Sequence, residues 1–265
     1  MSRASVTGAL AVVLALLGWA LRGTSLELTV FHAINAWGPQ APVFWSSWSV
    51  VGLGVSVLLI LAAGGAARAQ ALVTWVLVLV LGGLVLHAAK LGIGGLRPLA
   101  VLGPDGVHVV GAALLRSSMP SGHSATGFAL AALATQLHFR GAWVYWLGAL
   151  MVGLSRMAVG AHWPSDVLAG AGLGLLLALA GVRWPWAVRT AQACAVHMQS
   201  RAGSRLVAGA LVMLASGFWV ADYDYPAAAI THAGLCLLGL WAALVWWRAH
   251  PSHHFNHADD ARGAA

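Results

Sequence analysis

The sequence predicts an all-α fold: a polytopic transmembrane helical bundle with a six-helix core and a C-terminal two-helix hairpin. Its 265 residues are 60% hydrophobic and only 8% charged, with a mean hydropathy of +0.82. A soluble domain is about a quarter charged, so this composition excludes a soluble globular protein. It also excludes a disordered chain, which needs low hydrophobicity and high charge. Apolar runs of about 20 residues, long enough to cross a bilayer, recur along the chain.

Six apolar runs form the expected core, residues 1–185. The first, 6–21, is interpreted as an uncleaved helix, because its apolar stretch is long and ends at Arg22 without a small-residue cleavage site. Five more spans are expected at 42–67, 69–89, 121–139, 142–154 and 165–182. Residues 91–119 are rich in glycine and contain Pro98 and Pro104, which indicates a loop with a short helix at 109–115.

The segment at about 26–40 has a different pattern. Leu26, Val30 and Ile34 recur at helical spacing, and Glu27 and Asn35 fall elsewhere on the helical wheel. An amphipathic helix of this kind lies on a membrane more readily than it crosses one. We therefore expect an interfacial segment on the periplasmic side of the core.

Three further segments follow the core. We expect a basic cytoplasmic linker at 186–204, a transmembrane hairpin at 205–248 and a flexible tail at 249–265. The hairpin holds none of the reactive polar residues described below, so we expect it to be structural or oligomeric. The tail holds four histidines, which we expect to belong to a flexible tail and not to a metal site.

The basic residues predict the orientation. The net charge is +7, but the Lys and Arg residues are scattered singly between apolar runs, a pattern that does not indicate nucleic-acid binding. Membrane proteins keep their basic loops in the cytoplasm. With both termini in the cytoplasm, nine of the 14 Lys and Arg residues lie on the cytoplasmic side, and five of the seven acids lie opposite. This distribution favours a multi-pass protein with both termini cytoplasmic.

Unusual polar residues meet at the periplasmic ends of spans three to six. Ionisable groups this close to a bilayer are costly and indicate function. Arginine offers a planar fork of donors that matches phosphate oxygens, lysine adds a point charge, and the first turn of a helix has free N–H groups for an anion. The set consists of Lys90, Arg97, Pro98, Pro120, Ser121, Gly122, His123, Ser155, Arg156, His162 and Asp166. It predicts a phosphate site.

Two histidines and a carboxylate add reactive chemistry to this site. His162 and Asp166 are four residues apart, so they share one helix face. A carboxylate placed in this way can hold an imidazole in one tautomer and stabilise its charged form. His123 supplies a second imidazole, which gives the site both a nucleophile and an acid.

The spacing of these residues resembles that of a known family. Lys90-x6-Arg97-Pro98, Pro120-Ser121-Gly122-His123 and Ser155-Arg156-x5-His162-x3-Asp166 match, in order and spacing, the three-part signature of the type 2 phosphatidic acid phosphatase superfamily. The resemblance covers about residues 6–185, the six-helix core of its membrane members.

The resemblance implies a role for each residue. His162 would be the nucleophile that becomes a phosphohistidine, Asp166 its orienting partner, and His123 the acid that protonates the leaving oxygen and then activates water. The implied phosphate cradle consists of Lys90, Arg97, Ser121, Gly122 and Arg156. Further residues that could support the site are Pro98, Pro120, Ser155, Arg116 and His87. For Arg116 we weigh substrate contact against loop packing, and for His87 we favour plain helix packing.

The resemblance also implies an activity. The expected protein is a bacterial inner-membrane phosphatase whose active site faces the periplasm and hydrolyses a lipid phosphate or diphosphate, such as undecaprenyl diphosphate or phosphatidylglycerophosphate. Alternatives are a lipid A phosphatase or phosphotransferase and a non-enzymatic lipid-phosphate carrier. Two-metal phosphatases need several carboxylates, and Asp166 is the single acid in this set. We therefore expect no metal and no cofactor. The oligomeric state is left open.

Overall fold

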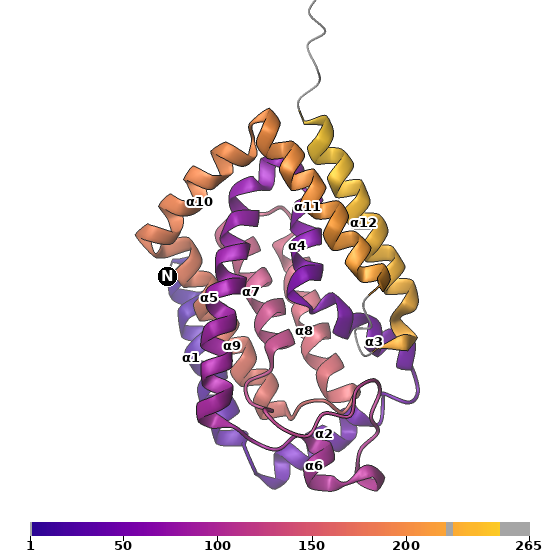
Figure 1. Cartoon of the computed structure of the whole chain (residues 1–265). Helices are drawn as coiled ribbons and strands as arrows, with labels where there is room; N and C mark the ends of the chain where they lie inside the picture. The colour runs from indigo at the N-terminus through magenta and orange to yellow at the C-terminus, as the bar shows by residue number, and fades with distance from the viewer. Residues whose placement is uncertain (1, 221–224, 250–265) are drawn as a thin grey trace, which may run out of the picture.

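The computed structural model describes residues 2–220 and 225–249, which form helices and no strand. The bounds are α1 Arg3–Leu21, α2 Ser25–Asn35, α3 Pro42–Val51, α4 Gly54–Ala62, η1 Gly65–Arg68, α5 Ala69–Ile93, α6 Pro98–Leu102, η2 Pro104–Gly106, α7 Gly122–Gln136, α8 Ala142–Ala158, α9 Pro164–Arg183, α10 Pro185–Met198, α11 Arg201–Val220, η3 Pro226–Ala228 and α12 Ala229–Arg248. The predicted all-α bundle is confirmed (Figure 1). The four histidines of the tail lie outside the described residues.

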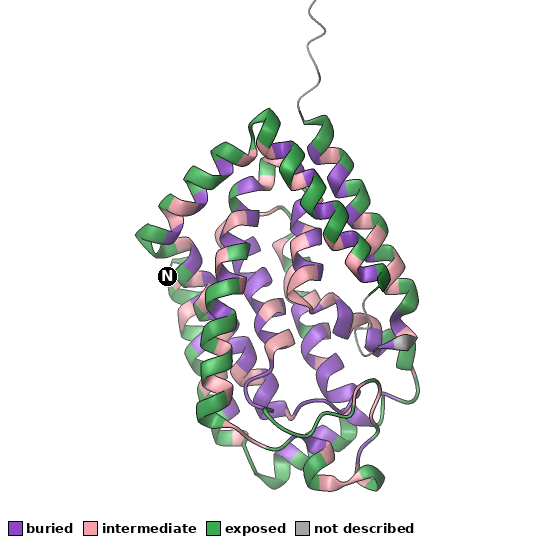
Figure 2. Cartoon of the chain, viewed as in Figure 1, coloured by how far each residue is buried: buried purple, intermediate pink, exposed green. Residues whose placement is uncertain are grey.

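The number of membrane-crossing helices differs from the expected eight. Within the described residues, five helices are long and apolar enough to cross a bilayer: α1, α5 with η1, α9, α11 and α12. The pair α3–α4 could make a sixth. Helices α7 and α8 have 15 and 17 residues, fewer than the ~20 that a full crossing needs. Helix α7 lies between α8 and α9 and is buried along most of its length (Figure 2).

The segment of the expected span at 42–67 is two helices and not one, because α3 and α4 meet at a bend of 72°. The break falls at Gly52, where an added Cβ would lie 2.6 Å from Val152 Cγ1 of α8. Two side chains take up carbonyl groups near the break. The Ser56 hydroxyl donates to the Val50 carbonyl at 2.6 Å, and the Trp75 indole N–H donates to the Gly54 carbonyl at 3.1 Å. The first bond ties α4 to α3 across the break, and the second ties α5 to the start of α4.

The expected short helix at 109–115 is also wrong. The short helices of this loop are α6 and η2, and each begins with a proline, which suits a first helical turn. Residues 110–116 form backbone hydrogen bonds with other segments of the chain and not with one another as in a helix. Val110 N–H donates to the Val159 carbonyl at 3.1 Å, Arg97 N–H donates to the Leu115 carbonyl at 3.0 Å, and Leu96 forms an antiparallel bridge with Arg116. This part of the loop is therefore extended and tied to the end of α8.

Helix α2 falls within the expected amphipathic segment, but its polar residues Glu27 and Asn35 face the protein. Glu27 is only 5% exposed, whereas Leu26 is 61% exposed. The Glu27 carboxylate accepts from the backbone N–H groups of Gly23 at 2.6 Å and Ser165 at 3.1 Å. A carboxylate at this position stabilises the first turn of α9. Helix α2 is thus joined to α9 by a buried hydrogen bond from Ser165 to Glu27. The position of α2 on the membrane surface stays a prediction.

The C-terminal segments surround the core. Most of the expected linker is helix α10, which packs against α5 at the end of the bundle opposite α2 and α6 (Figure 1). Helices α11 and α12 pack against each other and against α4, and α12 also contacts α3. The expected division into core, linker and hairpin stays a prediction.

Close contact between α7 and α9 depends on glycine. Gly174 of α9 lies directly against the carbonyl oxygen of Ala125 on α7, so a Cβ there would meet backbone that cannot rotate away. We expect Gly174→Ala to lower the free energy of unfolding by about 1–3 kcal/mol, the range typical of overpacking. The measurement is denaturant unfolding in detergent. Gly83→Ala is the control, because nothing lies within 4 Å of the position of its Cβ. Equal stability of the two variants would contradict this account of the contact.

Candidate active site

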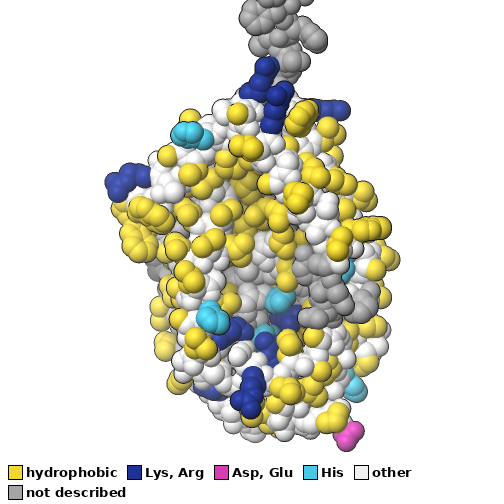
Figure 3. All heavy atoms as spheres, viewed as in Figure 1, with side chains coloured by type: hydrophobic (Ala, Val, Ile, Leu, Met, Phe, Trp, Pro, Cys, Tyr) yellow, Lys and Arg dark blue, Asp and Glu magenta, His cyan; other side chains and the backbone are white. Residues whose placement is uncertain are grey.

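The residues that the sequence singled out come together at one end of the bundle. Lys90 lies in the last turn of α5, His123 in the first turn of α7, Arg156 near the end of α8, and Asp166 in the first turn of α9. Arg97 immediately precedes α6 and His162 lies between α8 and α9. In Figure 3, Lys, Arg and His side chains gather in a hollow in the lower half of a largely hydrophobic face. The bundle thus places cations and imidazoles from four helices and two loops side by side.

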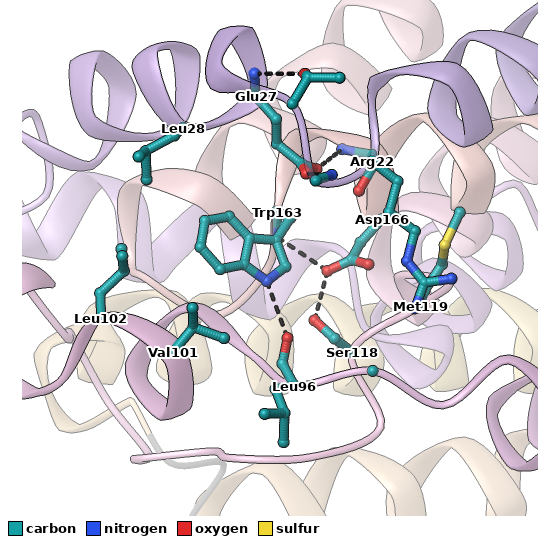
Figure 4. A pocket seen from close by; sticks show the side chains of 14 residues that line it. Arg22, Glu27, Leu28, Leu96, Val101, Leu102, Ser118, Met119, Trp163 and Asp166 are labelled. Atoms are coloured by element: carbon teal, nitrogen blue, oxygen red, sulfur yellow. Dashed lines mark hydrogen bonds between the residues drawn. The ribbon is translucent and has the colours of Figure 1, made fainter.

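Asp166 is held by three groups at once. Its Oδ2 lies 3.3 Å from His162 Nδ1. It also accepts from Trp163 N–H at 2.9 Å and from the Ser118 hydroxyl at 2.5 Å (Figure 4). Asp166 and His162 are each only 2% exposed. Asp166 and Ser118 also line a cavity of about 320 Å³. The carboxylate is therefore fixed before any ligand binds.

The partners of His162 determine its tautomer. Nδ1 faces a carboxylate, which can only accept, so Nδ1 bears the proton and Nε2 has the free lone pair. Burial, with Arg97, Arg156 and Lys90 adding to it, lowers the pKa of His162 well below its usual value of 6.5. At neutral pH the 3.3 Å contact with Asp166 is thus a hydrogen bond from a neutral imidazole. Nε2 lies 3.3 Å from Arg97 Nη1, a donor that a phosphate oxygen could draw away.

Backbone carbonyl groups hold two of the three cations. Arg97 donates from Nε to the Arg116 carbonyl and from Nη1 to the Ala161 carbonyl, both at 2.9 Å. Lys90 Nζ donates to the Ser117 carbonyl at 2.7 Å. The extended part of the loop thus presents its carbonyl oxygens to the cations. Their side chains are oriented without a second carboxylate.

Two buried nitrogens at the site have no hydrogen-bond partner. They are Nε of Arg156 and Nε2 of His123. Arg156 is 2% exposed, and its Nη1 donates to the Tyr225 hydroxyl at 2.6 Å. Buried polar atoms are nearly always paired, so unpaired nitrogens here indicate a place for a ligand that carries hydrogen-bonding oxygens. With three cations and one carboxylate nearby, the ligand that fits is an anion.

Ser121 and Gly122 begin α7. The Ser121 hydroxyl accepts from the Ser124 N–H at 3.4 Å and from the Ser124 hydroxyl at 3.0 Å, and its N–H donates to the Asp166 carbonyl at 2.9 Å. Ser121 thus caps α7 and joins it to α9. The helix N-terminus lies at the site, where it favours an anion. Direct contact of either residue with phosphate stays a prediction.

The expected supporting residues divide into two groups. Pro98 is buried at the start of α6, Pro120 is buried and follows a cis peptide bond, and the buried Ser155 hydroxyl lies 3.1 Å from that of Ser49. These three shape the backbone around the site. Arg116 and His87 have exposed side chains, and Arg116 contributes its carbonyl group to Arg97. The structure thus gives Arg116 a loop-packing role.

Sequence reasoning missed two residues of the site. Ser118 orients Asp166, and the one signal for it was its place two residues before Pro120. Tyr225 contacts Arg156 from the turn between α11 and α12, where no motif marks it. The hairpin, which we expect to be structural or oligomeric, thus places one side chain against a cation of the site.

Arg97 provides a test of the anion site. We expect Arg97→Gln to weaken the binding of orthovanadate, a phosphate-like oxyanion, by at least about tenfold, because hydrogen bonds to charged groups are lost. The dissociation constant can be measured by calorimetry, with thermal unfolding as a check on folding. Arg116→Gln is the control, since only the backbone of Arg116 contacts Arg97. Equal loss in both variants would mean that general surface charge attracts the anion.

Comparison with known proteins agrees with this geometry. Residues 71–190 match the model of the PAP2 superfamily. The chain is 39% identical over 101 residues to lipid A 1-phosphatase of Porphyromonas gingivalis, which covers 37% of this chain and 20% of the relative. It is 34% identical over 151 residues to lipid A 1-phosphatase of Rhizobium johnstonii, a match that covers 46% of this chain and 59% of the relative. It is 41% identical over 63 residues to the bacitracin transport permease protein BcrC of Bacillus licheniformis, a match that covers 24% of this chain and 31% of the relative.

The chain thus spans between a fifth and three fifths of the length of these relatives. The matched residues 71–190 include Lys90, Arg97, His123, Arg156, His162 and Asp166. The match to the PAP2 superfamily model thus falls on the segment that holds the candidate site.

Proposed function

We propose that this chain is an integral membrane phosphatase that hydrolyses a lipid phosphate or diphosphate through a phosphohistidine intermediate. The observation that carries the proposal is the position of a neutral, oriented His162 beside buried nitrogens that have no hydrogen-bond partner. His162 Nδ1 faces Asp166, and the buried nitrogens of Arg156 and His123 have no partner. Binding alone would need no nucleophile, so this pair favours catalysis over a carrier.

The first step is phosphoryl transfer to His162. Lys90, Arg97 and Arg156 neutralise the bound phosphoryl oxygens, and Arg97 Nη1 turns from His162 Nε2 to one of them. The Nε2 lone pair then forms a bond to phosphorus as the bond to the leaving oxygen breaks. Asp166 stabilises the positive charge that develops on the imidazole, as the carboxylate of a triad does. This arrangement places charge stabilisation where the transition state needs it.

His123 moves the protons. The negative charge of the bound phosphate favours the protonated form of His123, which donates to the leaving oxygen. This oxygen departs as the lipid alcohol or the lipid monophosphate. The neutral imidazole then takes a proton from water as the water oxygen attacks phosphorus and the bond to His162 Nε2 breaks. Each cycle thus consumes one water and returns both histidines to their starting states.

The relatives favour one substrate class. Two of the matched proteins are named lipid A 1-phosphatases, so we propose the 1-phosphate of lipid A as the first substrate to test. Undecaprenyl diphosphate and phosphatidylglycerophosphate, which the sequence favoured, are the other candidates. Transfer of the phosphate to a second lipid is the alternative reaction. We further propose that the site faces the periplasm of a bacterial inner membrane, with both termini in the cytoplasm, as the charge distribution predicts.

A panel of lipid phosphates tests the activity and the metal independence together. Purified protein in EDTA should release inorganic phosphate from at least one of lipid A, undecaprenyl diphosphate and phosphatidylglycerophosphate, and orthovanadate should inhibit the release. His162→Ala should abolish the release and the acid-labile phosphate on the quenched enzyme. The control is His87→Ala, an exposed histidine one helical turn before Lys90.

The possible outcomes separate the readings. Phosphate found on a second lipid would favour a phosphotransferase, and lipid binding without phosphate release would favour a carrier. Activity lost in EDTA and restored by Mg²⁺ would contradict metal independence.

The lowered pKa of His162 predicts a pH profile. The nucleophile must be neutral, and a group with a lowered pKa becomes neutral at lower pH, so the acid limb of kcat/KM should lie below pH 6.5. Lys90 is one of the charges that lower this pKa, so Lys90→Gln should move the limb to higher pH. Comparing the two proteins with one substrate cancels the ionisation of the substrate itself. If the acid limb of kcat/KM does not move in Lys90→Gln, a group other than His162 causes it.

A further inference from the structure

We propose that Tyr225, from the turn that joins α11 to α12, is a substrate-binding residue of the phosphate site, whose hydroxyl accepts from Arg156 and donates to a phosphoryl oxygen. The proposal rests on the proposed function, because it assigns one more contact to the same bound phosphate. Tyr225 lies outside residues 71–190, the segment that matches the family model. The hairpin would then complete a site that the family segment leaves open.

Tyr225 is buried at the site. It is 7% exposed, and its hydroxyl accepts from Arg156 Nη1 at 2.6 Å. The guanidinium carbon of Arg156 lies 5.7 Å from the centre of the tyrosine ring, so both the ring and the hydroxyl contact this cation. One residue of the hairpin thus contacts a cation of the site.

The hydroxyl has an unused proton. A phenol can donate one hydrogen bond and accept two. Arg156 uses one acceptor position, and the hydroxyl donates to no residue in the part of the chain that the structure describes. The adjacent Arg156 Nε is also a buried donor without an acceptor. Two residues in contact thus each have an unused donor at the site, and phosphoryl oxygens would accept from both.

Other contacts hold the hairpin in place, so the Tyr225 hydroxyl is not needed as an anchor. The Thr231 hydroxyl of α12 donates to the Ser47 hydroxyl of α3 at 2.6 Å. The hydroxyl groups of Ser49 on α3 and Ser155 on α8 lie 3.1 Å apart, one residue before Arg156. These two links fix α12 to α3 and α3 to α8. The contact of Tyr225 with Arg156 is a further link, which joins the hairpin directly to α8 at the site.

The test compares two tyrosines whose hydroxyl groups each accept a hydrogen bond from an arginine, one at the site and one away from it. Tyr145 of α8 accepts from Arg68 Nη1 at 3.1 Å, an arginine that belongs to no part of the site. Tyr225→Phe keeps the ring and removes one oxygen, and Tyr145→Phe is the matched control. We expect Tyr225→Phe to weaken orthovanadate binding and raise KM by about tenfold, as for one hydrogen bond to a charged group. Tyr145→Phe should leave both quantities unchanged.

A second measurement uses the unsubstituted chain. The sequence has three tyrosines, so protein labelled with 3-fluorotyrosine should give three ¹⁹F signals. Spectra of Tyr145→Phe and Tyr223→Phe assign two signals and leave the third to Tyr225. Orthovanadate should shift the Tyr225 signal and leave the Tyr145 signal in place.

The outcomes distinguish this proposal from the proposed function. Unchanged vanadate affinity in Tyr225→Phe together with an unmoved Tyr225 signal would overturn the proposal. Tighter binding in Tyr225→Phe would also overturn it, because the hydroxyl would then occupy the place of the phosphate oxygen. If the unsubstituted protein releases no phosphate from any lipid while vanadate still shifts the Tyr225 signal, the proposed activity fails and the binding role of Tyr225 stands.

Discussion

Three cations that share one buried carboxylate are the constraint on which this site depends. Lys90, Arg97 and Arg156 repel one another, and Asp166 is the single counter-charge that the residues around them supply. Backbone carbonyl groups of the 116–118 loop and of Ala161 hold two of the cations in place without neutralising them. The excess positive charge makes the site complementary to a phosphate. Burial, with this charge adding to it, keeps the nucleophilic imidazole neutral.

The bundle brings these charges together because the ends of four helices lie at the site. The N-termini of α7 and α9 and the C-termini of α5 and α8 reach the same end of the molecule (Figure 1). Glycines of α9 lie against the backbone of α7, which brings the Ser121 cap next to Asp166. Helix α2 adds Glu27 to the first turn of α9. The close packing of these helix ends therefore brings the site residues together.

The C-terminal hairpin links the outer part of the molecule to the chemistry. Its Tyr225 contacts Arg156, and its α12 is held to α3 and, through α3, to α8. The bend between α3 and α4 leaves α3 beside the start of α12, where it serves as the connector. A segment outside the family match can in this way influence how the shared cradle holds its ligand.

The sequence by itself determined the composition class, most helix positions and the main site residues. Each motif is local: His162 and Asp166 share a helix turn whatever surrounds them, and apolar runs between charges mark helices. Only the tertiary structure decided the bend at Gly52, the inward direction of Glu27, the extended loop at 107–116, and the roles of Ser118 and Tyr225. These features depend on contacts between segments far apart in the chain, where a neighbouring backbone or an unpaired polar group sets the conformation. No local pattern contains that information.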